Sequence, residues 1–375
     1  MYKVCIRADG GCNIGMGHIM RCISLGKMFE QKGCEVFFIS KYKEGKEAIK
    51  ANGFDIIPLT VEDKGYNIEL GFTYEGGKHL ESEKEELANI LKNKKVDIFI
   101  IDHYNVTEDT FMFLKSYVSI LAYIDDVNAF TYPVDVVING NITGKHIGYK
   151  SYFKEQQFLL GPSYNLIREE FKHTPIRNVF EKVKKIMVTT GASDSFGVTG
   201  QLIDMVRSEN LFNEIELHVI MGNSFINKAE IKEKQSKYKN IVIYENIEKI
   251  SKIMLNCDIA LSSCGSTLYE LCACGVPTLG FILAKNQAFI AEKMDELGYI
   301  KNLGWYYNFK EEEIIRGIKF FINNFESRKE MVEKQQNLVD GRGTERVVGA
   351  IIKMMKEKEG VTHEKKIHTL RETMD

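Results

Sequence analysis

The first thirty residues of the chain form a unit that restricts the fold more than any other segment. Residues 2–8, YKVCIRA, are mostly apolar and predict a buried strand. Residues 9–17 contain four glycines and predict a loop, and from His18 apolar residues recur at helical spacing until Gly33 ends the predicted helix. A buried strand, a glycine loop and a helix in this order indicate the first unit of a parallel α/β sheet. Such a loop and helix N-terminus can hold an anion or a reacting polar group.

The alternation of strands and helices continues along the chain and restarts in its second half. In the first half we expect strands over 34–40, 54–59, 96–101, 118–124, 134–139 and up to 160, helices over 44–52, 79–93 and after Thr107, and a loop over 61–78. In the second half we expect strands over 185–190, 215–222, 240–245, 258–263 and after Pro277, with helices from Phe196, over 246–257, after 263 and over about 343–355. Alternation of this kind predicts parallel sheets with right-handed crossovers.

The chain is therefore expected to be an α/β protein with two Rossmann-like parallel-sheet domains. A polar, charged segment over 171–185 separates the two series of strands. We predict an N-terminal domain over 1–162, a C-terminal domain over 163–355 and a charged tail over 356–375, with the last helix crossing back towards the N-terminal domain. The length of 375 residues suits two domains of ordinary size.

Composition excludes several classes of partner. The formal net charge is −2, which gives no electrostatic reason to expect nucleic acid or an anionic membrane as a partner. No apolar run is long enough to span a bilayer, and the chain start lacks the pattern of a secretion signal, so we expect a cytoplasmic protein. We also expect a monomer. The eight cysteines include no CxxC pair, and we predict neither a metal site nor a cofactor.

Polar side chains follow the predicted strands of the first half, at the point where each strand ends. They are Asp9, Asp102, His103, Asp125, Asp126 and Asn139. Because the carboxyl ends of parallel strands line the ligand crevice of such a sheet, we expect these side chains to share one polar cleft.

His18 is the candidate for chemistry in that cleft. The partial positive charge of a helix N-terminus favours a neutral imidazole, and a neutral imidazole can accept a proton as a general base. The alternative is a histidine that caps its helix or bonds a carbonyl in the loop. Arg21, one turn further on, could contact a phosphate or a carboxylate, or could lie on a solvated helix face.

The second half contains two further glycine and hydroxyl loops. Residues 262–267 end a predicted strand and begin a helix, with Ser266 or Thr267 as candidate N-caps. Their N–H and hydroxyl groups could hold a diphosphate, and Glu270 could accept hydrogen bonds from a ribose diol or complement the helix dipole. Residues 191–194 form a second loop of this kind. Two such loops opposite a third predict a nucleotide-sugar site.

The chain resembles the UDP-2,4-diacetamido-2,4,6-trideoxy-β-L-altropyranose hydrolase family of pseudaminic acid biosynthesis, which is related to MurG-like glycosyltransferases. The segments that carry the resemblance are RADGGCNIGMGHIMRC, IIDHYNV, YIDDVNAFTYPVDVVIN, LLGPSYNLIREEF, VTTGASDS, SSCGSTLYELCACGVPTLGF, Asn286-Gln287 and VDGRGTERV. They run in the family's order from Tyr2 to about Val348. Ala192 stands where the family usually has a second glycine, a conservative change unless the loop needs a positive φ there.

The resemblance implies a GT-B-like fold, with the two Rossmann-like domains facing across a cleft. It implies hydrolysis of the anomeric C–O bond of a UDP-linked sugar with inversion, with His18 as the base that activates water and no metal or cofactor. The resemblance places Gly17, Arg21 and Asn286 at the substrate, and Ser266, Thr267 and Glu270 at the diphosphate and ribose. Together with the strand ends and loops, we predict that substrate is bound by Asp9, Gly15, Gly17, Arg21, His103, Tyr104 and Asn286. We predict that UDP is bound by Gly191, Ala192, Ser193, Asp194, Gly265, Ser266, Thr267 and Glu270. Two alternatives remain: a UDP-sugar-dependent GT-B glycosyltransferase, and a non-catalytic nucleotide-sugar binding protein.

Overall fold

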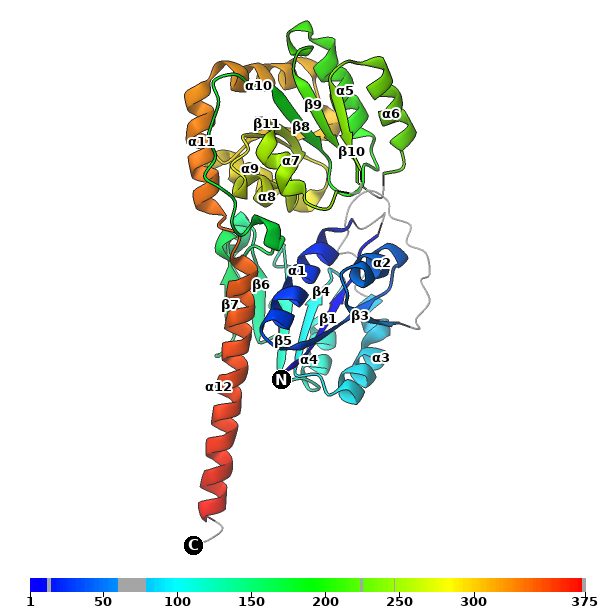
Figure 1. The fold of residues 1–375 in the computed structure, drawn as a ribbon. Helices are drawn as coiled ribbons and strands as arrows, with labels where there is room; N and C mark the ends of the chain where they lie inside the picture. The colour runs from blue at the N-terminus through cyan, green and yellow to red at the C-terminus, as the bar shows by residue number, and fades with distance from the viewer. Residues whose placement is uncertain (12–14, 60–78, 223–224, 246, 373–375) are drawn as a thin grey trace.

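The computed structural model describes residues 1–11, 15–59, 79–222, 225–245 and 247–372, so the loop predicted over 61–78 lies outside it. Two α/β domains lie one above the other, as Figure 1 shows, and each is built on its own parallel sheet. The prediction of two parallel-sheet domains is confirmed. The domain boundaries at residues 162 and 355 stay predictions.

The N-terminal sheet has seven parallel strands in the order β3-β2-β1-β4-β5-β6-β7. Their bounds are β1 (Lys3–Ala8), β2 (Glu35–Ser40), β3 (Asp55–Pro58), β4 (Ile98–Asp102), β5 (Ile120–Ile124), β6 (Val136–Asn139) and β7 (Gln157–Leu160). The helices of this part are α1 (Gly17–Gln31), α2 (Lys43–Ala51), α3 (His79–Lys94) and α4 (Glu108–Lys115), with short 3₁₀ turns η1 (Ile142–Lys145), η2 (Pro162–Tyr164) and η3 (Glu169–Phe171).

Alternate side chains of these strands enter two separate cores. In β1, Val4 and Ile6 pack with α1 and α2 on one face, whereas Cys5 packs with α3 and α4 on the other. A parallel sheet is covered by helices on both faces, which is why its strands read as continuous apolar runs in the sequence.

The C-terminal sheet has six parallel strands in the order β10-β9-β8-β11-β12-β13. Their bounds are β8 (Lys185–Thr189), β9 (Glu216–Ile220), β10 (Ile241–Tyr244), β11 (Ile259–Ser263), β12 (Thr278–Ile282) and β13 (Lys301–Trp305). The helices are α5 (Val198–Ser208), η4 (Asn210–Phe212), α6 (Lys228–Lys237), α7 (Ile250–Asn256), α8 (Thr267–Ala273), α9 (Lys285–Glu296), η5 (Tyr306–Asn308), α10 (Glu311–Asn323) and α11 (Phe325–Leu338). Of these elements, β13 and the helices α6, α9, α10 and α11 were not predicted from the sequence.

In each sheet, successive strands are added first on one side of the first strand and then on its other side. The order reverses between β1 and β4 in the first sheet and between β8 and β11 in the second. In doubly wound sheets, ligands bind outside the carboxyl ends of the strands at this point. The register pairs Ala8 with Asp102, so the residues that follow β1 and β4 emerge side by side.

The last helix, α12 (Gly343–Glu372), returns from the C-terminal domain and runs along the N-terminal domain (Figure 1). Val347, Ile351 and Met355 are buried in the same core as α1, so the predicted crossing is confirmed. The helix does not stop near Met355, where a tail was predicted to begin. The residues that follow are largely Lys, Glu and other good helix formers, and Gly360 alone does not end a helix in such a sequence.

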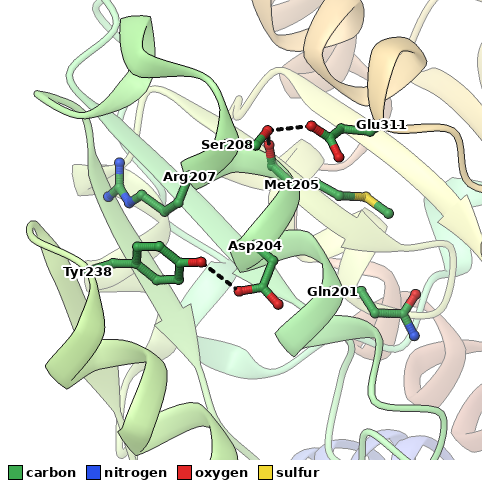
Figure 2. Close-up of a pocket in the computed structure, with 7 residues that line it drawn as sticks. All are labelled: Gln201, Asp204, Met205, Arg207, Ser208, Tyr238 and Glu311. Atoms are coloured by element: carbon green, nitrogen blue, oxygen red, sulfur yellow. Dashed lines mark hydrogen bonds between the residues drawn. The ribbon is translucent and has the colours of Figure 1, made fainter.

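A hollow of about 460 Å³ lies on the C-terminal domain, where α5, Tyr238 and the start of α10 meet (Figure 2). Asp204 and Tyr238 are hydrogen-bonded to each other in its wall, at 3.1 Å. No residue predicted for the site lines this hollow. No helix within the described ranges is both long and apolar enough to cross a membrane.

Candidate active site

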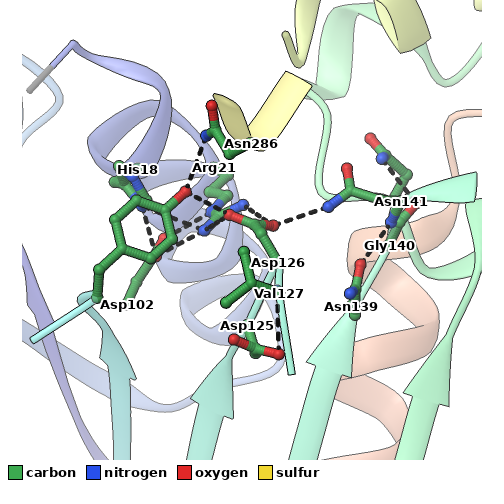
Figure 3. Close-up of polar contacts among 12 residues, drawn as sticks. His18, Arg21, Asp102, Asp125, Asp126, Val127, Asn139, Gly140, Asn141 and Asn286 are labelled. Carbon is green, nitrogen blue, oxygen red and sulfur yellow. Dashed lines mark hydrogen bonds and ion pairs between the residues drawn. The ribbon is translucent and has the colours of Figure 1, made fainter. Parts of the chain in front are cut away.

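His18 lies in the first turn of α1 and points towards the end of the neighbouring strand β4. Its Nδ1 is 2.6 Å from Oδ1 of Asp102 (Figure 3). Burial alone would raise the pKa of Asp102, but the charges of Arg21 and His18 outweigh it and hold that pKa well below its usual value. An ionised carboxylate accepts the Nδ1 proton, which leaves Nε2 as the basic nitrogen. Nε2 makes no hydrogen bond to any residue that the structure describes.

Arg21 donates hydrogen bonds to the carboxylates of both Asp102 and Asp126. Its Nε and Nη2 donate to Asp102 at 2.6 and 2.7 Å, and its Nη1 and Nη2 donate to Asp126 at 3.0 and 3.1 Å. Nη2 also lies 3.1 Å from Nδ1 of His18, but a guanidinium cannot accept a proton and the carboxylate is closer, so Asp102 is the partner of Nδ1. Arg21 therefore contacts two carboxylates of the protein itself, and its predicted contact with substrate stays a prediction.

Tyr104 packs against the ring of His18 and reaches the second domain. The two rings meet edge to face with their centroids 4.8 Å apart. The hydroxyl of Tyr104 donates to Asp126 at 2.8 Å and accepts a hydrogen bond from Nδ2 of Asn286 at 3.2 Å. Asn286 lies at the start of α9, so this bond joins the C-terminal domain to the candidate base of the N-terminal domain. The structure thus brings together four predicted residues, His18, Arg21, Tyr104 and Asn286.

Asp9 and His103 were predicted to contact substrate, and the structure engages both within the protein. Asp9 is 4% exposed and pairs with the buried Arg7 at 2.7 Å, which outweighs burial and lowers the pKa of Asp9. Nδ1 of His103 accepts from the N–H of Asn105 at 3.1 Å, and its Nε2 lies 3.6 Å from Asp9. Burial and the nearby charge of Arg7 lower the pKa of His103 to about 3, so this imidazole is neutral. Both side chains are therefore held by contacts within the protein, and their predicted contact with substrate stays a prediction.

The glycine loops of the two domains approach each other closely. A Cβ atom added at Gly17 would lie 3.9 Å from Oγ of Ser266, across the domain boundary. Ser266 occupies the N-cap position of α8 as predicted, but its side chain makes no capping hydrogen bond and is exposed. Gly15, just before α1, adopts a φ of +74°, which favours glycine there. Thr267 and Gly265 are half-exposed beside Ser266, and Gly265 faces the amide of Gln287.

The second predicted loop, over residues 191–194, is shaped by an internal cap. Asp194 is 2% exposed and accepts hydrogen bonds from the N–H groups of Val198 and Thr199 at 2.8 and 2.9 Å. Its carboxylate therefore caps α5 rather than facing solvent. Gly191 has a φ of +98°, whereas Ala192 is not among the residues with positive φ, so alanine fits the position where the family usually has glycine. Ser193 is half-exposed at the tip of the loop.

Glu270 has a partner that the sequence reasoning missed. Both of its oxygens accept hydrogen bonds from Arg168 at 2.8 Å, and Arg168 also pairs with Glu170 at 3.2 Å. Glu270 is 8% exposed, in the first turn of α8, and can still offer a second lone pair on each oxygen. The sequence did contain a signal, since Arg168 lies in the segment LLGPSYNLIREEF that carries the family resemblance. Asp126 lies in YIDD and was predicted to share the polar cleft, but no role in binding or catalysis was predicted for it.

No protein-family model matches the chain. The UDP-2,4-diacetamido-2,4,6-trideoxy-beta-L-altropyranose hydrolase of Campylobacter jejuni is 26% identical over 300 residues, 79% of this chain and 97% of that protein. Spore coat polysaccharide biosynthesis protein SpsG of Bacillus subtilis is 21% identical over 358 residues, 94% of this chain and 98% of that protein. The uncharacterized protein MJ1062 of Methanocaldococcus jannaschii is 26% identical over 298 residues, which span 76% of this chain but only 56% of that protein.

Solved structures establish the fold. MurG of Acinetobacter baumannii superposes with a TM-score of 0.65 at 16% identity, covering 94% of this chain and 99% of that one. The calicheamicin glycosyltransferase CalG4 gives a TM-score of 0.66 at 12% identity, covering 95% and 98%. The chain has the GT-B fold. The sequence relatives suggest a role in sugar-nucleotide or polysaccharide biosynthesis, and their names include both hydrolase and glycosyltransferase.

Proposed function

We propose that the protein hydrolyses the anomeric C–O bond of a UDP-linked 2,4-diacetamido-2,4,6-trideoxyhexose, releasing UDP and the free sugar with inversion. The observation that supports this most is the contact of His18 with Asp102, at the edge of the N-terminal sheet that faces the C-terminal loops. An imidazole whose Nδ1 is held by an ionised carboxylate presents its basic Nε2, which is the arrangement required of a general base.

The proposed reaction takes place in one displacement. Nε2 of His18 accepts a proton from water as the water oxygen attacks the anomeric carbon from the face opposite UDP. The electron pair of the breaking C–O bond leaves on the β-phosphate oxygen, which yields UDP and an inverted sugar. Asp102 stays ionised and stabilises the imidazolium that forms, as a carboxylate does beside a catalytic histidine. The imidazolium then returns its proton to solvent.

The UDP leaving group is assigned to the C-terminal domain. Ser266 is exposed opposite the start of α1, and Gly265 and Thr267 beside it are half-exposed. We propose that N–H and hydroxyl groups of these three residues contact the diphosphate. Glu270 is proposed to accept a ribose hydroxyl while Arg168 holds its carboxylate in place. The loop over residues 191–194 would complete this side of the site.

The sugar class rests on the resemblance and on the Campylobacter jejuni relative, which carries this hydrolase name at 26% identity. A glycosyltransferase that passes the sugar to another acceptor stays an alternative, because the structural neighbours include a glycosyltransferase. Release of UDP without any acceptor separates hydrolysis from transfer, and saturable UDP binding without turnover would indicate a binding protein.

The decisive experiment follows the water oxygen. A panel of UDP-sugars is incubated with the protein in ¹⁸O-labelled water, and the products are examined by mass spectrometry. We expect the label in the sugar and unlabelled UDP, at a rate that chelator does not change. Label in the phosphate, or sugar 1-phosphate among the products, would refute attack at carbon, because phosphorus attack needs a base beside the diphosphate and usually a divalent metal.

A further inference from the structure

Asp126 is the point at which the contacts around His18 converge, although it touches neither ring nitrogen of that histidine. It follows β5 at the carboxyl edge of the N-terminal sheet, and its side chain is 10% exposed. Figure 3 shows its carboxylate directed towards Arg21 and Asn141, while the adjacent Asp125 is directed towards the N–H of Val127. The two consecutive carboxylates thus have different partners: Asp125 contacts the backbone of its own loop, and Asp126 contacts side chains around His18.

The carboxylate of Asp126 is fully occupied by four hydrogen bonds. Oδ1 accepts from Asn141 at 2.8 Å and from Arg21 at 3.0 Å. Oδ2 accepts from Tyr104 at 2.8 Å and from Arg21 at 3.1 Å. A carboxylate offers about four lone-pair sites, so none is left for a ligand. Burial alone would raise the pKa of Asp126, but the charge of Arg21 outweighs it and lowers that pKa, which keeps the group ionised.

Two of the three partners of Asp126, Arg21 and Tyr104, also contact the surroundings of the His18 ring. Arg21 donates to Asp102, which holds Nδ1 of the ring, and Tyr104 packs edge to face against the ring itself. Tyr104 in turn accepts the hydrogen bond from Asn286 of the C-terminal domain. Loss of the Asp126 charge would therefore weaken its hydrogen bonds to both Arg21 and Tyr104.

We propose that Asp126 is a positioning residue, which orients the His18 imidazole through Arg21 and Tyr104 and ties that orientation to the contact between the domains. The part of this inference that concerns turnover rests on the proposed function. The part that concerns the ring does not, because the orientation of an imidazole can be observed without substrate. Displacing a reacting group by about 1 Å can lower a rate about a hundredfold, and this sets the scale of the expected effect.

The test uses Asp126→Asn, which keeps the shape of the side chain and removes its charge. We expect kcat for UDP release to fall about 10- to 100-fold with KM changed less than about 3-fold, because the group acts on the base rather than on binding. Asp109→Asn is the matched control, since Asp109 is exposed on α4. An unchanged kcat in Asp126→Asn would overturn the proposal, whether or not KM rises.

The second measurement is independent of activity. In the ¹H NMR spectrum, the Nδ1 proton of His18 should give a downfield signal from its short bond to Asp102, assigned by its loss in His18→Asn. We expect Asp126→Asn to shift or broaden this signal and Asp109→Asn to leave it in place. An unmoved signal would refute the positioning role, whereas absent turnover in the unaltered protein would refute only the proposed function.

A double-mutant cycle tests the route through the tyrosine. Tyr104→Phe removes only the hydroxyl that donates to Asp126 and leaves the ring against His18. Because both changes alter the same contact, their effects on kcat should be less than multiplicative in the double variant. Multiplicative effects would show that the two residues act separately. If Asp126→Asn fails to fold, Tyr104→Phe replaces it as the test, because a shift of the His18 Nδ1 signal in that variant reports the same contacts.

Discussion

His103, whose side chain is 14% exposed, allows a quantitative test of the ion cluster that it forms with Asp9 and Arg7. The change is His103→Asn, which keeps an acceptor for the N–H of Asn105 and removes the group that can take up a proton. In the folded protein the pKa of His103 is lowered from 6.5 to about 3 by burial and by Arg7. Below pH 6.5 the unfolded chain therefore binds a proton at His103 that the folded chain does not. This proton uptake stabilises the unfolded chain, so the free energy of unfolding decreases as the pH falls.

The size of this effect follows from the two pKa values. Between pH 7.5 and pH 5 the unfolded histidine becomes almost fully protonated while the folded one stays neutral, which lowers the free energy of unfolding by about 2 kcal/mol. In His103→Asn that contribution is absent. The parent should therefore lose about 2 kcal/mol more than the variant over this interval. The carboxylates of the cluster also titrate on unfolding, but they do so in both proteins and mostly below pH 5.

The assay is urea unfolding at pH 7.5 and pH 5, with the two domains followed separately. Trp305 is the chain's only tryptophan and lies in β13, so its fluorescence reports the C-terminal domain, while circular dichroism also reports the N-terminal domain. We expect the difference between parent and variant in the circular dichroism transition alone. His146→Asn is the matched control because His146 is exposed. Equal losses in the parent and in His103→Asn would refute a His103 that stays neutral in the folded protein.

The remaining predictions concern turnover and UDP binding. His18→Asn should lower kcat about a hundredfold or more while calorimetry finds UDP bound nearly as in the parent, and near-normal turnover would return His18 to a capping role. Asp102→Asn should lower kcat by about 10²- to 10⁴-fold without weakening UDP binding, because the amide no longer holds the required tautomer, and a change confined to KM would contradict this. Glu270→Ala should weaken UDP binding by about 2–3 kcal/mol in calorimetry, and unchanged affinity would leave Glu270 with its ion pair to Arg168 and its helix-dipole role.

Several residues show how far local sequence patterns could predict the site. The strand–glycine–helix unit placed His18 at the start of α1, and the polar residues after each strand indicated a shared cleft, because both depend on neighbours within a few positions. The same reasoning could not distinguish a residue that faces the cleft from one that supports it. Asp9, Arg21 and His103 all carry groups that could bind a ligand, but each contacts another residue of the protein. Asp126, the partner of Arg21, is distant in the sequence, and no local pattern identifies Arg7 as the partner of Asp9.

What the sequence alone determined is the class of fold: apolar strands alternating with helices, twice over, specify two parallel sheets because each element follows from local periodicity and turn residues. What only the tertiary structure decided is which side chains meet. Asp102 joins His18 across 84 positions because β1 and β4 are neighbours in the sheet, and Asn286 joins Tyr104 across 182 positions because the two domains face each other. Hydrogen bonds act over about 3 Å, so partners this far apart in the chain are set by strand order and domain packing, which no local pattern encodes.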